Sequence, residues 1–231
     1  MNSHTIALTF DLDDTLWPIW PTIARAEVRL HEWLSAHAPA TAGRYEPAAL
    51  RQLRDEVAAT HPEWAHDLGT MRRESIRLGL SRAGDDPSLA EPAFEVFFEA
   101  RQQVVFFEDA RAALERLAAR YPLFAVTNGN SDLERVGLAS LFQGSVSAHG
   151  VGIAKPDARI FHLACQQLQC EPRQVLHVGD DLRLDVAGAL DAGLQAVWLH
   201  RGEGPEGGLP VLSAPYRRFG DLLQLADALG C

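Results

Sequence analysis

Four short apolar runs in the chain have the pattern of buried β-strands. Each is rich in β-branched or large apolar residues, and none shows the polar alternation of a strand with one exposed face. The runs span residues 5–10, 123–127, 175–178 and 195–199. Helix-like segments separate the last three runs, and this alternation predicts a parallel sheet covered by helices on both faces.

Helical periodicity dominates the rest of the chain. Residues 18–104 contain no convincing strand, but prolines and polar residues mark several helix starts. Helices are expected from about residue 21, at 47–59, 70–81 and 91–101, and later at 109–120, 131–137, 156–168 and 219–229. The glycine-rich segment 202–208 has the composition of a flexible loop. The pattern predicts an α/β protein whose core, residues 1–17 and 105–231, is interrupted by an inserted helical domain, residues 18–104.

Composition narrows the class of protein. The chain has 231 residues and a formal net charge of −10, which is spread along the sequence and disfavours binding to nucleic acid. No apolar run is long enough to span a bilayer, and the first residues lack the features of a signal peptide, so we expect a cytoplasmic protein without a membrane partner. Three cysteines without a paired spacing indicate neither a disulfide framework nor a zinc site. An anionic ligand would need a cation to offset the negative charge of the chain.

Acidic residues crowd the end of the first strand, in Phe-Asp-Leu-Asp-Asp-Thr-Leu at residues 10–16. Asp11 and Asp13 are the outstanding members of this motif. Open α/β sheets bind their ligands at the carboxyl ends of the strands, and two carboxylates placed there repel each other unless a cation lies between them. An acidic turn that bonds to its own backbone is the alternative.

A second acidic cluster follows the third strand, in Val-Gly-Asp-Asp-Leu-Arg-Leu-Asp at residues 178–185. Asp180, Asp181 and Asp185 supply hard oxygen ligands, and together with the first motif they suit Mg²⁺, which binds through one or two carboxylates plus substrate phosphate. Capping of a helix by Asp180 or Asp181 is the alternative.

Two weaker features complete the pattern. Thr127 and Asn128 end the second strand and offer a hydroxyl, an amide and backbone N–H groups to a phosphoryl group, although an ordinary turn has the same composition. Lys155 precedes a proline that opens a helix, where it would neutralise phosphate or simply lie on the surface.

These four parts occur in one order along a parallel-sheet pattern, and in this combination the chain resembles the haloacid dehalogenase-like superfamily. The resemblance implies a Rossmann-like core with an α-helical cap inserted after the first motif. It also implies that Asp11 is a nucleophile that forms an aspartyl-phosphate and that Asp13 is the general acid and base. Mg²⁺ would bind the carboxylates of Asp11 and Asp180 and the main-chain carbonyl of Asp13. Phosphate would be held by the residues of the weaker features, Thr127, Asn128 and Lys155.

The remaining acidic residues take supporting roles in this resemblance. Asp185 would act from outside the direct metal ligands, and Asp181 would be either part of the metal sphere or a helix cap. Dehalogenases of the superfamily lack the second aspartate of the first motif, so the presence of Asp13 favours a phosphatase, while a mutase would keep both aspartates. A non-catalytic module that retained the fold is the alternative from another class.

Three motifs are similar to those of bacterial phosphatases that act on FMN and on 5-amino-6-(5-phosphoribitylamino)uracil. They lie at residues 8–16, 126–130 and 177–181, and the segment 66–75 is similar as well. The substrate is therefore expected to be a small phosphorylated metabolite of this kind, with a nucleoside monophosphate, a sugar phosphate or phosphoglycolate as alternatives. Trp17 and Trp20 would stack on a flat heterocycle or pack in a hinge. Arg72 or Arg73 would reach the substrate or lie on an exposed helix face. The sequence leaves monomer and homodimer both open.

Overall fold

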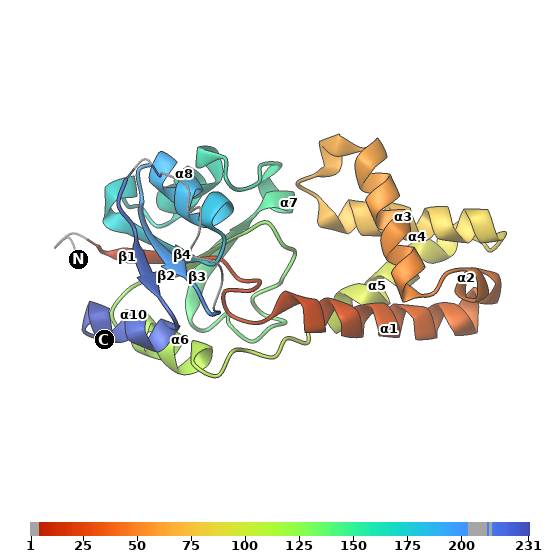
Figure 1. Ribbon diagram of the computed structural model, residues 1–231, viewed down its shortest axis with the longest axis horizontal. Coiled ribbons are helices and arrows are strands. Elements are labelled where there is room, and N and C mark those ends of the chain that lie inside the picture. The colour runs from red at the N-terminus through yellow and green to blue at the C-terminus, as the bar shows by residue number, and fades with distance from the viewer. Residues whose placement is uncertain (1–4, 203–211, 213) are drawn as a thin grey trace. The chain divides into compact units, whose positions relative to one another are not determined.

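The computed structural model describes residues 5–202, 212 and 214–231, and within it the chain forms two compact units (Figure 1). The core unit comprises Met1–Pro18, Val105–Gly129 and Leu133–Cys231, and the helical unit comprises Ile19–Val104 with Asn130–Asp132. Except for Gly202, the glycine-rich loop expected at 202–208 lies outside the described residues.

The core unit is built on a six-stranded parallel sheet in the order β3-β2-β1-β4-β5-β6. The four expected strands are present within a residue or two as β1 (Ala7–Phe10), β2 (Leu123–Thr127), β4 (Val175–Gly179) and β5 (Gln195–Leu199). Two strands were not expected, β3 (Phe142–Ser147) and β6 (Arg217–Phe219). Both lie at an edge of the sheet and carry exposed polar residues, so neither has the continuous apolar run of a central strand.

Helices cover both faces of this sheet (Figure 1). One face carries α6 (Ala110–Ala118) and α10 (Leu222–Leu229), and the other carries α8 (Ala158–Gln167) and α9 (Gly188–Asp191). Shorter elements are α7 (Ala148–Val151), the 3-10 turn η3 (Pro172–Gln174) and the π-helical turn η4 (Leu182–Ala187). The apolar cluster beneath α8 and α9 includes Ala7, Phe161 and Val175. Side chains two positions further along β1 and β4, those of Thr9 and His177, therefore point to the same face of the sheet.

The helix expected at 131–137 is absent, and this prediction was wrong. Residues 133–137 form a turn closed by a hydrogen bond from the backbone N–H of Leu138 to the carbonyl of Leu133. Gly137 lies in the left-handed region with φ 76°, which ends any helical progression after a single turn.

The helical unit contains α1 (Ile19–His37), α2 (Pro39–Arg44), α3 (Pro47–Thr60), α4 (Leu68–Ala83) and α5 (Ala90–Arg101), with 3-10 turns η1 (Pro62–Trp64) and η2 (Pro87–Leu89). Its own apolar cluster includes Leu30, Leu34, Leu80 and Phe94. None of the described helices in either unit is long and apolar enough to cross a membrane.

The order of the strands predicts where a ligand would bind, at the carboxyl ends of the central strands. The chain moves from β1 to β2 and β3 on one side and then returns to β4 on the other side of β1. Open parallel sheets bind ligands at such a reversal, beyond the carboxyl ends of the strands. The loops that follow β1, β2 and β4 therefore face the position where a ligand is expected.

Candidate active site

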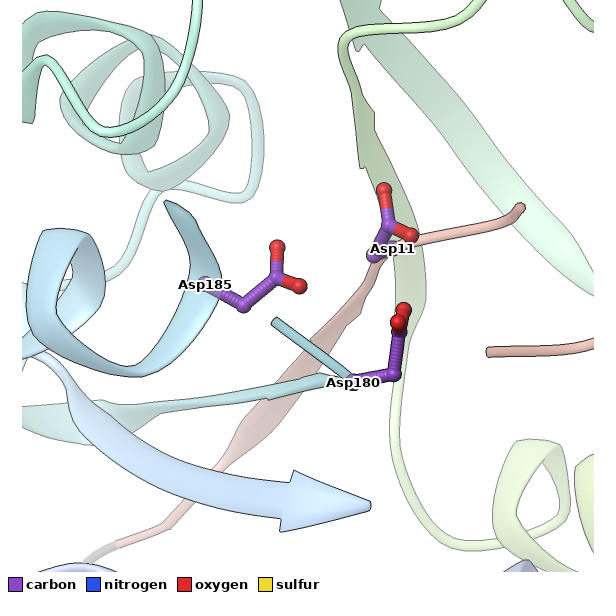
Figure 2. Close-up of side chains that lie close together, drawn as sticks. All are labelled: Asp11, Asp180 and Asp185. Atoms are coloured by element: carbon purple, nitrogen blue, oxygen red, sulfur yellow. The ribbon is translucent and has the colours of Figure 1, made fainter. Parts of the chain in front are cut away.

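Three carboxylates converge beyond the ends of β1 and β4 (Figure 2). Asp11 follows β1, Asp180 follows β4, and Asp185 reaches in from η4. One carboxylate oxygen from each lies within 4.8 Å of the others. Asp180 and Asp185 follow Asp11 by 169 and 174 positions in the chain. They meet it because β1 and β4 are hydrogen-bonded neighbours, with Phe10 opposite Val178.

The turn after β4 positions Asp185. The side chain of Asp181 caps η4 by accepting hydrogen bonds from the backbone N–H groups of Arg183 and Leu184, each at 2.7 Å. The backbone N–H of Asp181 itself donates to Oδ2 of Asp185 at 3.0 Å. Of the two roles considered for Asp181, the structure shows the capping contact.

Lys155 links two of the carboxylates and is buried. Its Nζ lies 2.5 Å from Oδ1 of Asp11 and 2.6 Å from Oδ1 of Asp185. The side-chain amide of Asn128 makes two hydrogen bonds to the backbone of Lys155. Its Nδ2 donates to the Lys155 carbonyl at 3.0 Å, and its Oδ1 accepts from the Lys155 N–H at 2.8 Å. The side chain of Asn128 therefore positions Lys155.

Two threonines lie near the same carboxyl ends of the strands. Thr127 is buried at the end of β2, and its hydroxyl accepts a hydrogen bond from the N–H of Gly129 at 2.9 Å. Thr15 donates its hydroxyl to Oδ1 of Asp180 at 2.8 Å and lies 3.4 Å from Oδ2 of Asp11. Thr15 was not among the predicted site residues, although it belongs to the first motif at residues 10–16.

Asp13 lies half-buried in the loop after β1, and the indole N–H of Trp17 donates to its Oδ1 at 2.8 Å. Trp17 has no exposed surface and packs edge to face on Phe106 with ring centroids 5.4 Å apart. Its buried ring is not available to stack on a substrate, so the structure selects the packing role for Trp17. Arg201 binds the carbonyl of Thr15 at 3.0 Å and thereby secures the same loop.

The site carries an excess of negative charge. Burial raises the pKa of Asp11, and the carboxylates of Asp185 and Asp180 act in the same direction against the opposing effect of Lys155. Burial and Asp185 raise the pKa of Asp180 to about 6. Burial alone would lower the pKa of Lys155, but the two carboxylates beside it outweigh this and raise its pKa. Three carboxylates with one ammonium group thus favour a further cation.

The arginines considered for substrate contact lie within the helical unit. Arg72 is 4% exposed, pairs with Glu27 at 3.5 Å and packs over the ring of Phe97 at 4.3 Å. Burial lowers the pKa of Arg72 to about 10. Arg73 is more accessible and packs over the ring of Phe94 at 3.9 Å. Arg72 is therefore not on an exposed helix face, whereas Arg73 is partly exposed and pairs with Glu91 at 3.2 Å.

A model of the haloacid dehalogenase-like hydrolase family matches residues 7–193. The chain belongs to this family. The match includes β1, β2 and β4 with the four-part pattern of acidic, threonine and lysine residues, so the resemblance recognised in the sequence is confirmed. The parallel sheet with its helices is the fold of the family's solved structures.

Several relatives of the chain are named as phosphatases. YigB of Escherichia coli strain K12, a 5-amino-6-(5-phospho-D-ribitylamino)uracil phosphatase, is 35% identical over 206 residues, which cover 87% of this chain and 84% of YigB. A phosphoserine phosphatase of Thermus thermophilus is 38% identical over 174 residues, which cover 72% of this chain and 68% of that protein. Family membership and these relatives identify the chain as an enzyme of the phosphatase class.

A solved structure is also similar over nearly the full length. The crystal structure of a 2-haloacid dehalogenase from Pseudomonas syringae pv. Tomato aligns with a TM-score of 0.88 and 34% identity, covering 98% of each chain. This likeness shows the fold. The name of that protein raises the question of which reaction the aspartate of the first motif performs here.

Proposed function

We propose that the chain is a magnesium-dependent phosphomonoesterase that works through an aspartyl-phosphate on Asp11. The observation that carries this proposal is the convergence of Asp11, Asp180 and Asp185 within 4.8 Å, with Lys155 as the one cation bonded to them among the described residues. Hard carboxylate oxygens are the ligands that Mg²⁺ prefers.

The donor set fits the metal. Asp11 and Asp180 both have raised pKa values, so a divalent cation beside them would restore their ionised forms. These two carboxylates and the backbone carbonyl of Asp13 would hold the ion, as the family resemblance implies. When bound, Mg²⁺ would offset the negative charge of the carboxylates and of the phosphoryl oxygens.

The chemistry falls to three side chains. The carboxylate of Asp11 attacks phosphorus and forms an acyl phosphate while the bond from phosphorus to the leaving oxygen breaks. Asp13 gives a proton to that oxygen, and the alcohol departs. In the second step Asp13 takes a proton from water as the water attacks phosphorus, which releases phosphate and regenerates Asp11. Lys155 and the backbone N–H groups after Thr127 stabilise the charge of the transferred group.

The presence of Asp13 separates this reaction from dehalogenation. A halide leaves without a proton, whereas an alkoxide requires one, so a carboxyl group two residues after the nucleophile is useful only in the second case. In the structure Asp13 is half-buried and held by Trp17 rather than enclosed in the core. We therefore expect hydrolysis of phosphate esters and no release of halide from 2-haloacids.

We further propose FMN or 5-amino-6-(5-phosphoribitylamino)uracil as the substrate. Support comes from the three motifs that the chain shares with phosphatases of this kind and from the activity named for YigB. Other relatives are named for phosphoserine and for pyrimidine nucleotides, which keeps other small phosphorylated metabolites as the alternative. Residues 18–104 are proposed to act as the cap domain that selects among them.

A phosphate-release screen with Mg²⁺ tests both levels of the proposal. The panel contains FMN, the phosphoribitylaminouracil, nucleoside monophosphates, sugar phosphates, phosphoglycolate and phosphoserine, with a 2-haloacid assayed for halide. Highest kcat/KM on one of the first two supports the flavin-pathway substrate, and preference for a sugar phosphate overturns it while leaving the phosphatase intact.

Variants and metal removal test the mechanism. We expect Asp11→Asn to abolish turnover and a chelator to stop it reversibly, with Mg²⁺ restoring activity. Asp227→Asn is the matched control, because it removes a carboxylate from an exposed surface ion pair with Arg116. Retention of activity in Asp11→Asn, or in chelator, would contradict the proposed mechanism.

A further inference from the structure

A histidine is buried in the sheet directly behind the active site. His177 lies in the middle of β4 with no exposed surface, and the register of the sheet places it opposite Thr9 of β1. Its Nδ1 lies 2.9 Å from the hydroxyl oxygen of Thr9, and its Nε2 lies 3.2 Å from Oδ1 of Asp185. The ring of Phe161 packs against it edge to face at 5.0 Å. A polar ring in this position is costly to bury unless both nitrogens are hydrogen-bonded.

We propose that His177 is a positioning residue, which fixes the carboxylate of Asp185 and through it the ammonium group of Lys155 for reaction at Asp11. This inference rests on the roles proposed above for Lys155 and Asp11. His177 itself does not touch the substrate position.

The periodicity of the strands builds this arrangement. Side chains two residues apart point to the same face of a strand, so Thr9 shares a face with Asp11, and His177 shares one with Gly179. Gly179 leaves open the space that Asp185 fills, since a Cβ at this glycine would lie 2.3 Å from Cγ of Asp185. Thr9, His177 and Asp185 therefore form a chain of contacts on one face of the sheet.

The carboxylate of Asp185 is held from three directions. Its Oδ2 accepts from the backbone N–H of Asp181, and its Oδ1 accepts from both Lys155 and His177. The lysine and the histidine thus share one oxygen atom. Because Lys155 bonds to Asp185 at 2.6 Å and to Asp11 at 2.5 Å, any displacement of Asp185 also displaces the ammonium group from the nucleophile.

The hydrogen bonds define which nitrogen of His177 carries the proton. The ionised carboxylate of Asp185 only accepts hydrogen bonds, so Nε2 of His177 must donate to it. Nδ1 is then free to accept the hydroxyl proton of Thr9, which fixes the tautomer from the other side. Burial lowers the pKa of His177 and thereby favours the neutral ring that this pattern requires.

The test compares substitutions that keep or remove the donor. His177→Gln retains an N–H group on a side chain of similar reach, whereas His177→Phe fills the same space without a donor. Thr9→Val removes the hydroxyl with little change of volume. His162→Phe is the matched control, because His162 is an exposed residue of α8 whose Nε2 bonds to the backbone carbonyl of Ala192 at 2.9 Å.

We expect His177→Phe to lower kcat on the order of 10- to 100-fold, as supporting residues of such sites do, with KM changed by less than about threefold. His177→Gln should recover most of that loss, Thr9→Val should fall between the two, and His162→Phe should match the wild-type enzyme. A purely structural role would not produce recovery by glutamine with an unchanged KM. Equal kcat in folded His177→Phe and wild type would overturn the proposal.

The tautomer gives a readout that needs no catalysis and no stable variant. Imidazole ¹⁵N resonances of the wild-type enzyme should show His177 protonated at Nε2 and unprotonated at Nδ1. An unprotonated Nε2 would overturn the inference even if every variant failed to fold. Absence of phosphatase activity in the wild type would instead contradict the proposed function and leave the tautomer result standing.

Discussion

Substitution of Gly179 by alanine is a stringent test of how closely the site is packed. Gly179 is the last residue of β4, and a Cβ built on it would lie 2.3 Å from Cγ, 2.4 Å from Oδ2 and 2.5 Å from Cβ of Asp185. The Cβ atom of a side chain cannot rotate away from its own backbone. Asp185 would therefore have to move together with η4.

The size of this movement follows from ordinary contact distances. Carbon atoms in van der Waals contact lie about 3.5–4.0 Å apart, so the carboxyl group must shift by roughly 1 Å or more. A displacement of about 1 Å at a supporting residue costs on the order of 100-fold in rate. The forced repacking should also lower the free energy of unfolding by about 1–3 kcal/mol. For a chain of this size that corresponds to a fall in Tm of roughly 2–12 °C.

The assay measures kcat on an aryl phosphate with Mg²⁺ together with Tm from thermal unfolding. Gly43→Ala is the control, because a Cβ at Gly43 meets nothing within 4 Å and the residue lies within α2. Its Tm should stay the same or rise slightly, since alanine is the better helix former. If Gly179→Ala retained the kcat and the Tm of the wild type, the claim that Asp185 is fixed against β4 would be refuted.

Three further outcomes follow from contacts in the core and from one exposed ring. Thr15→Val removes the hydroxyl donor from Asp180, so the Mg²⁺ concentration for half-maximal activity should rise about tenfold in a titration. Burial opposes ionisation of Asp109, but hydrogen bonds from Arg201 and a backbone N–H lower its pKa; Asp109→Asn should therefore reduce Tm at pH 7, and the difference should shrink below about pH 4. Trp20 is 63% exposed, and Trp20→Ala should reduce turnover of FMN far more than that of an aryl phosphate; equal losses would exclude stacking.

The central strands were predictable because burial on both faces leaves a simple pattern. The run of β2 at Leu123–Thr127 is buried throughout and was located to the residue. The edge strand β3 (Phe142–Ser147) alternates buried and exposed positions around a glycine and two serines, so its sequence is that of a turn or loop as much as of a strand. Edge strands take their conformation from the neighbouring strand, and a single sequence does not report that pairing.

The acidic members of the site were also predictable, since Asp11, Asp180 and Asp185 follow two strongly apolar strands. The residues that hold them in place were not. His177 occupies a buried strand position where an apolar residue is the usual expectation, and its contact with Thr9 depends on the register between β1 and β4. Register is a property of the folded sheet rather than of either strand sequence.

The side chains of the candidate site come from one of the two units. All three clustered carboxylates and Lys155 belong to the core unit, where parallel strand ends and apolar surroundings make their mutual electrostatics strong. The helical unit supplies none of these groups, and its buried Arg72 is paired internally with Glu27. Because we propose that the helical unit selects the substrate, substitutions there should alter which phosphate ester is accepted and leave the proposed nucleophile in place. Relatives named for a ribitylaminouracil, for phosphoserine and for pyrimidine nucleotides fit this expectation, since a shared reaction accompanies different substrates.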